Sequence, residues 1–175
     1  MTKTFKSLKI KCKGNIKITE YTFSDEVIST ENLNSSIFRK LIFLNCSFHK
    51  VNFDGSSFAE CQFNECKFSE VGFSRTEFES CRFENCKIMN SDLSRGDFDE
   101  TSFDYCQFKK VSFSGSYFLD CRINQSDFKE TNYDGLPAII ANSQISKLDT
   151  SLNLKGAFNF TSLLKFLKSI PDSPS

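Results

Sequence analysis

The chain has 175 residues, and its 22 Lys and Arg balance 22 Asp and Glu, so the formal net charge at pH 7 is zero. A neutral chain argues against a protein that coats nucleic acid by charge alone, and the sequence has no apolar run of about 18 residues that would span a membrane. It holds a single His, which nearly excludes a His-based catalytic triad and a His-rich metal site.

Residues 1–17 are predicted to form an amino-terminal cap of short strands. Lys alternates with apolar residues on both sides of a Lys13-Gly14-Asn15 turn. This stretch lacks the apolar segment of about 7–15 residues that a secretory signal requires. We therefore expect a cytoplasmic protein whose eight Cys are reduced thiols rather than a disulfide framework.

From Ile18 to Tyr133 every fifth residue is large and apolar, a run of 24 positions that holds 17 of the 21 Phe. Neither the helical period of about 3.6 residues nor the strand period of about 2 produces this spacing. From Cys46 to Thr131 the residue two places before each central position is small or compact, and seven of the eight Cys occupy such positions. Two inward and three outward residues in every five indicate a chain that turns a corner every five residues.

A second period of 20 residues sets the number of corners. The phrases LNCSF, NECKF, ENCKI and DYCQF begin at positions 44, 64, 84 and 104. Four groups of five per turn predict a four-sided coil. If the coils stack at the strand spacing of about 4.8 Å, six coils form a rod about 29 Å long.

Over residues 18–135 this pattern resembles the pentapeptide-repeat family. The resemblance implies an all-β fold, a right-handed quadrilateral β-helix, here of about six coils. The use of Phe and Cys, where many members have Leu and Ala, is similar to the quinolone-resistance and microcin-immunity members. For those members the resemblance implies protection of DNA gyrase or topoisomerase IV by mimicry of duplex DNA, and dimerisation through the carboxy-terminal end.

Residues 136–175 are predicted as a carboxy-terminal cap. The five-residue register fails at residues 134–137, and residues 138–148 are either a short helix or a degenerate coil. A helix is predicted over residues 161–170, stopped by Pro171. The apolar residues of this cap either seal the rod or pair two rods into a homodimer: Phe158, Phe160, Leu163, Leu164, Leu167 and Ile170.

The zero net charge hides an uneven distribution. Residues 1–20 carry six Lys and one Glu, residues 21–135 carry 12 basic and 19 acidic residues, and residues 136–175 carry four Lys and two Asp. On the side that contains Phe78 and Phe98 the predicted contact residues are all acidic: Glu60, Glu77, Glu79, Asp97, Asp99, Glu100 and Asp120. The opposite side is rich in Lys: Lys50, Lys67, Lys87, Lys109, Lys110 and Lys129. The acidic side is either a solvated face that keeps the rod soluble or a stripe offered to a basic partner groove.

These observations predict a non-enzymatic binding protein with no cofactor and no metal. The Cys columns lack the paired ligand spacing of zinc sites and suit core packing, because Cys is small and commonly buried. The resemblance implies a type II topoisomerase such as DNA gyrase as the partner, and we expect it to bind through the acidic side, with no direct contact to nucleic acid or membrane. The alternative is a general protein-interaction scaffold or effector with an unknown partner.

Overall fold

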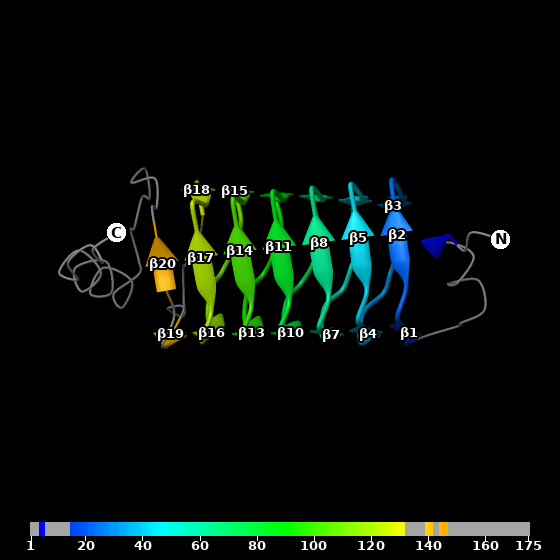
Figure 1. Ribbon diagram of the computed structural model, residues 1–175, viewed down its shortest axis with the longest axis horizontal. Helices are drawn as coiled ribbons and strands as arrows, with labels where there is room; N and C mark the ends of the chain where they lie inside the picture. The colour runs from blue at the N-terminus through cyan, green and yellow to red at the C-terminus, as the bar shows by residue number, and fades with distance from the viewer. Residues whose placement is uncertain (1–3, 6–14, 132–138, 142–143, 147–175) are drawn as a thin grey trace.

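The computed structural model describes residues 4–5, 15–131, 139–141 and 144–146. The chain forms an all-β, right-handed, four-sided solenoid of about six coils, with short strands that run across the long axis of the rod (Figure 1). The fold class predicted from the five-residue period is confirmed.

Three sides of the rod are parallel β-sheets, which we name faces A, B and C. Face A consists of β1 (Lys17–Thr19), β4 (Ile37–Arg39), β7 (Ser57–Ala59), β10 (Glu77–Glu79), β13 (Asp97–Asp99), β16 (Tyr117–Leu119) and β19 (Ile139–Ala141). Face B consists of β2 (Thr22–Ser24), β5 (Ile42–Leu44), β8 (Gln62–Asn64), β11 (Arg82–Glu84), β14 (Ser102–Asp104), β17 (Arg122–Asn124) and β20 (Gln144–Ser146). Face C consists of β3 (Val27–Ser29), β6 (Ser47–His49), β9 (Lys67–Ser69), β12 (Lys87–Met89), β15 (Gln107–Lys109) and β18 (Asp127–Lys129).

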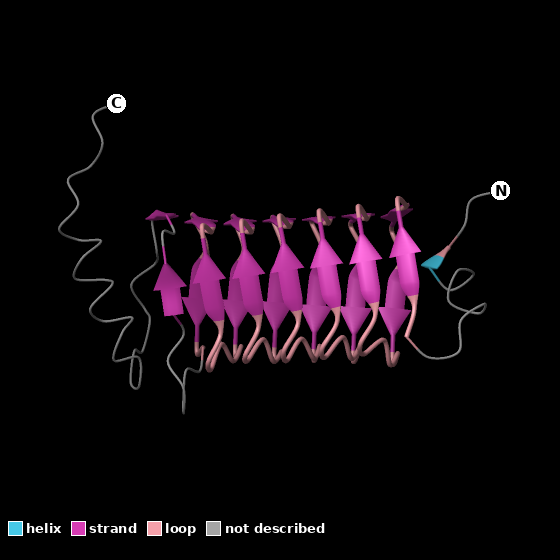
Figure 2. Cartoon of the chain, turned by 90° about the horizontal axis from the view of Figure 1, so that it is seen from below, coloured by secondary structure: helices cyan, strands magenta, loops and turns pink. Residues whose placement is uncertain are grey.

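The fourth side, face D, is built from turns instead of strands. Its neighbouring coils meet at isolated parallel bridges, such as the one between Asn52 and Gly72. Within a coil the Ser56 N–H donates to the Phe53 carbonyl at 3.0 Å, and Gly55 has a φ of 65°, as a type II turn requires. The Asn52 side chain also accepts a hydrogen bond from the Asp54 N–H at 2.8 Å, and this bond stabilises the turn. In Figure 2 the loops between strands line up along the rod.

Every fifth residue from Glu20 to Glu130 lies in the left-handed region, with φ between 46° and 70°. These residues form the corners, and only Gly55 and Gly115 among them are glycines. A left-handed conformation costs an ordinary residue about 1–2 kcal/mol. The corner amides nevertheless continue the inter-coil ladder, as where the Lys40 N–H donates to the Ala59 carbonyl at 2.9 Å. The ladder therefore holds the corners in this conformation.

The Phe side chains fill the interior in columns. Behind face B, the rings of Phe23, Phe43, Phe63, Phe83 and Phe103 stack with centroids 4.6 to 5.2 Å apart. Rings from neighbouring faces of one coil pack edge to face, and all five of these rings are buried. The inward orientation that the sequence predicts for the central positions is confirmed.

The small residues two places before each centre do more than leave room for the rings. The Cys66 thiol donates to the Phe43 carbonyl at 3.4 Å, and the Thr76 hydroxyl donates to the Phe53 carbonyl at 2.9 Å. Each bond joins one coil to the preceding coil, so the position favours a small side chain that carries a donor. The seven described Cys are buried free thiols, and burial raises the pKa of Cys121 to about 11.

At the amino-terminal end of the rod, the buried ring of Phe5 covers the first rings of the Phe column behind face B. Its centroid lies 5.3 Å from that of Phe23 and 6.2 Å from that of Phe43. Most of the predicted amino-terminal cap lies outside the described residues.

At the carboxy-terminal end, β19 and β20 extend faces A and B beyond residue 135. Phe118 pairs with Ile140 and Ile123 with Ile145, a step of 22 residues instead of 20. These strands lie within residues 138–148 and correspond to the degenerate coil, not to the short helix. The helix predicted over residues 161–170 and the six predicted dimer or cap residues lie outside the described part of the chain.

Candidate functional site

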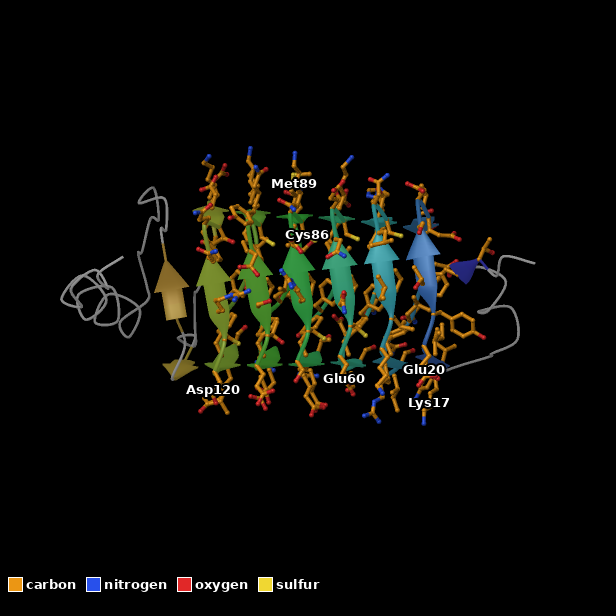
Figure 3. All side chains as sticks on the ribbon, viewed as in Figure 1. Lys17, Glu20, Glu60, Cys86, Met89 and Asp120 are labelled. Atoms are coloured by element: carbon orange, nitrogen blue, oxygen red, sulfur yellow. The ribbon has the colours of Figure 1, made fainter. Side chains whose placement is uncertain are left out.

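The outward side chains of face A change character along the rod. Lys17 and Arg39 make the amino-terminal part basic, and the short side chains of Ser57 and Ala59 follow on β7. The next two strands, β10 and β13, carry only carboxylates on their outward positions. Figure 3 shows the labelled Lys17 and Asp120 on the same side of the rod, at opposite ends of this gradient.

The carboxylates of β10 and β13 form a two-column ladder. Parallel pairing places Glu77 directly opposite Asp97 and Glu79 directly opposite Asp99. None of these four carboxylates has an ion pair within the described residues. Because like charges opposite each other destabilise a sheet, this ladder opposes folding and calls for an explanation other than stability.

Two corner carboxylates extend the ladder toward the carboxy-terminal end. Glu100 accepts a hydrogen bond from the Ser80 hydroxyl at 3.0 Å, and Asp120 lies exposed one coil later. We name the combined surface the acidic patch, which comprises Glu77, Glu79, Asp97, Asp99, Glu100 and Asp120.

Glu60, the seventh acidic residue predicted for this surface, lies in a different environment. Its carboxylate lies 2.9 Å from the Arg39 guanidinium and 3.9 Å from the Lys40 ammonium. The hydrogen bond from Arg39 lowers the pKa of Glu60 below its ordinary value. Glu60 is therefore locally neutralised by the preceding coil and stands apart from the acidic patch.

A shallow depression of about 430 Å³ lies at the corner between faces A and B. It is lined by Lys40, Ile42, Glu60, Gln62, Ser80 and Arg82. Among the described residues no group of three or more His, Cys, Asp or Glu is placed to hold a metal ion. Within the described residues, no helix is long and apolar enough to cross a membrane.

The sequence pattern alone missed one feature of this surface. Arg39 and Lys40 neutralise Glu60 from 21 and 20 residues away, a relation visible only when coils are aligned by the 20-residue period. Tyr117 is 38% exposed on β16, directly opposite Asp97, and provides an aromatic side chain at the edge of the acidic patch. Its outward orientation follows from its place beside the central Phe118.

Comparison with known proteins identifies the repeat. Residues 56–133 match the family model described as Pentapeptide repeat region. No curated protein matches the sequence. A solved structure of trypsin-treated QnrB1, a plasmid-mediated fluoroquinolone resistance protein, is 16% identical, covers 89% of this chain and 98% of its own, and has a TM-score of 0.35.

Two cyanobacterial structures are also similar. HetL from Nostoc sp. strain PCC 7120, a pentapeptide repeat protein involved in heterocyst differentiation regulation, is 9% identical with a TM-score of 0.33, and the match covers 78% of this chain and 90% of HetL. Rfr23 from Cyanothece 51142 is 9% identical with a TM-score of 0.32, and the match covers 74% of this chain and 91% of Rfr23. With the family match and the five-residue coils of the solenoid, residues 56–133 of this chain are a pentapeptide-repeat region.

Proposed function

We propose that this chain is a non-enzymatic binding protein that presents its acidic patch to the DNA-binding groove of a type II topoisomerase, such as DNA gyrase. The observation that carries the proposal is the ladder of Glu77 and Glu79 opposite Asp97 and Asp99, which has no ion pair among the described residues. A basic groove that normally receives phosphates would supply the missing positive charge. The resemblance of the repeat to quinolone-resistance and microcin-immunity members supports the choice of partner.

The charge density of the acidic patch supports mimicry of a duplex. Its six carboxylates lie on the three coils of β10, β13 and β16. At about 4.8 Å per coil these coils occupy about 14 Å of the axis, so one negative charge falls every 2–3 Å or so. Duplex DNA carries about one per 1.7 Å of its axis. The patch therefore approaches the linear charge density of DNA over a short length.

The surroundings of the patch favour binding over catalysis. Face A is a flat ladder, and the carboxylates stand on exposed or half-exposed strand positions without a nucleophile or base between them. A reaction site commonly needs a concave pocket in which titratable groups converge. We place the protein in the bacterial cytoplasm, where topoisomerases act and where its buried thiols stay reduced.

The experiment is DNA supercoiling by purified gyrase with increasing amounts of this protein, with and without a quinolone. We expect inhibition of supercoiling or protection from the drug, and loss of either effect in the triple variant Asp97→Lys, Asp99→Lys, Glu100→Lys. This variant is expected to fold, because the new Lys at 97 and 99 lie opposite Glu77 and Glu79.

The matched control carries Lys67→Glu and Lys87→Glu on the opposite face and should retain the effect on gyrase. An effect that persists in the triple variant would reject the acidic patch as the contact. No effect of the wild type at many-fold excess would reject the topoisomerase. The scaffold alternative would then be pursued by capture of partners from a bacterial lysate.

A further inference from the structure

Face C carries a basic ladder that the proposed function does not use. Parallel pairing places Lys67 of β9 directly opposite Lys87 of β12, and neither has an ion pair within the described residues. Lys109 and Lys129 are likewise opposite each other, although they are paired with Glu130 and Asp127. Like charges in register destabilise this sheet as they destabilise face A.

The acidic and basic ladders lie on opposite sides of one rod. The chain passes from face A to face B, then to faces C and D, in every coil, so faces A and C are opposite sides of the square. Figure 3 shows the labelled Met89 of face C on one side and Glu60 and Asp120 on the other. With a formal net charge of zero, the molecule has no overall repulsion to keep copies apart.

We propose that face C of one rod binds face A of a second copy of this chain, so that rods associate side by side. Both ladders repeat once per coil, at about 4.8 Å, because both are built on the same 20-residue step. The strands of faces A and C run in opposite directions across the rod, so a shift of one coil along the axis sets Lys67 and Lys87 of one copy against Glu79 and Asp99 of the next. Each ladder then gains the opposite charges that it lacks within its own rod.

The symmetry of this contact determines the kind of assembly. Because two different faces meet, the contact is heterologous, and a translated copy leaves a free face A and a free face C at the ends of the row. The rows are therefore open-ended and grow with protein concentration. Since the contact joins exposed charges, salt weakens it, with a screening length of about 10 Å at 0.1 M and less at higher ionic strength.

The test is the mass of the purified full chain, measured by light scattering and sedimentation at pH 7 in 20 mM and 500 mM NaCl. We expect a mass that rises with concentration in the dilute salt and a small species of constant mass in the concentrated salt. A wild-type mass that is the same at both salt concentrations over a wide range of protein concentration would overturn the proposal.

Two charge-reversal variants make the test specific. The C-face variant, Lys67→Glu with Lys87→Glu, sets carboxylates against Glu79 and Asp99 of the next copy, and the A-face variant, Glu79→Lys with Asp99→Lys, sets ammonium groups against Lys67 and Lys87. Each alone should stay small in 20 mM NaCl. An equimolar mixture should associate again, because the acidic face A of the first meets the basic face C of the second, and the reversed faces also complement each other.

Several results would contradict this inference. Association of either variant alone to the wild-type extent, or failure of the mixture to regain mass while both variants keep the wild-type circular dichroism, would overturn it. Gain of mass by the wild type only after nucleic acid is added would assign face C to that partner instead. The inference does not rest on the proposed function, because light scattering of the purified chain involves no topoisomerase.

Discussion

The guanidinium of Arg122 donates a hydrogen bond of 2.7 Å to the carboxylate of Asp104, one coil away on face B. The Asp104 side chain is only 6% exposed, whereas that of Arg122 is 53% exposed. The Arg122→Ala variant leaves a buried carboxylate without this partner, so we expect the free energy of unfolding to fall by about 1–3 kcal/mol. Urea denaturation followed by circular dichroism measures this loss.

The matched control for this prediction is Arg82→Ala, on the same face. Arg82 pairs with Glu84 at 3.3 Å, but both side chains are more than a third exposed. Exposed pairs contribute about 0–1 kcal/mol, so this variant should lose about 0.5 kcal/mol or less. Equal losses in the two variants would contradict the role of burial at Asp104.

A mid-rod ring tests the core. Phe83 stacks on Phe63 at 4.6 Å and on Phe103 at 4.9 Å, and packs edge to face against Phe78 at 5.6 Å. Phe83→Ala removes these contacts and leaves a cavity, so we expect a loss of about 3–5 kcal/mol in the free energy of unfolding. Chemical denaturation gives the value.

The conservative variant Phe83→Leu controls for the loss of volume. Ile88 and Leu93 occupy central positions in the same coil, so the solenoid accommodates aliphatic side chains there. We expect the Leu variant to lose clearly less than the Ala variant. A Phe83→Ala protein as stable as the wild type would show that this ring contributes nothing to the core.

Because Thr30 lies at a left-handed corner, we expect that replacing it with Asn stabilises the protein. The φ of Thr30 is 53°, a conformation that β-branched residues avoid and Asn tolerates. Thr30→Asn keeps the backbone bond from the Thr30 N–H to the His49 carbonyl. We expect this variant to be more stable by about 0.5–1 kcal/mol, measured as a higher denaturation midpoint.

The reverse substitution at another corner provides the control. Asn85 has the same φ of 53°, so Asn85→Thr should lose a similar amount. If neither substitution moved the midpoint, backbone strain at the corners would not limit the stability of the rod.

The buried thiols predict a loss of stability in alkaline solution. Burial raises the pKa of Cys121 to about 11 from an ordinary value of 9.0, and burial also raises that of Cys81. Above pH 9 the unfolded chain loses thiol protons that the folded chain retains, so the free energy of unfolding falls as the pH rises from 9 toward 11. Thermal unfolding over this range measures the fall.

Replacement of one thiol isolates this effect from other titrating groups. Thr101 stands at the equivalent position of the same column and bonds to the Phe78 carbonyl, so Cys121→Thr should fold. The variant should lose less stability than the wild type between pH 9 and 11. Parallel pH profiles for the two proteins would exclude Cys121 as a contributor.

The five-residue sequence pattern was sufficient to predict the fold because it encodes burial directly. Phe63 and Phe83 stand between polar neighbours at a spacing that only a cornered coil can bury, and the 20-residue period fixes the number of sides. The left-handed corners left no such signal, because Glu, Lys, Asn, Thr and Tyr all occupy them. At the corners, the backbone hydrogen bonds between coils hold residues in a left-handed conformation that their side chains disfavour. The turns of face D were also not predicted, although Asn52 and Asp92 are typical turn residues.

The candidate site was predictable in outline but not in detail. The period of 20 brought Glu77 and Asp97 to one side, and the structure shows them directly opposite each other. Whether a charge stays unpaired depends on side chains in adjacent coils, and Arg39 reaches Glu60 across such a step. The burial of Asp104 likewise depends on three-dimensional packing, which neither the five-residue nor the 20-residue period predicts.

The uniform coil of residues 18–131 restricts how such a protein can change its length. Removal of 20 residues would shorten the rod by about 4.8 Å and leave every later column in line with the earlier ones. Removal of five would rotate all later strands by a quarter turn and split each charged column between two neighbouring sides. The surface pattern therefore survives only insertions and deletions of whole coils, which makes the coil, not the five-residue unit, the smallest step by which this surface can be lengthened or shortened.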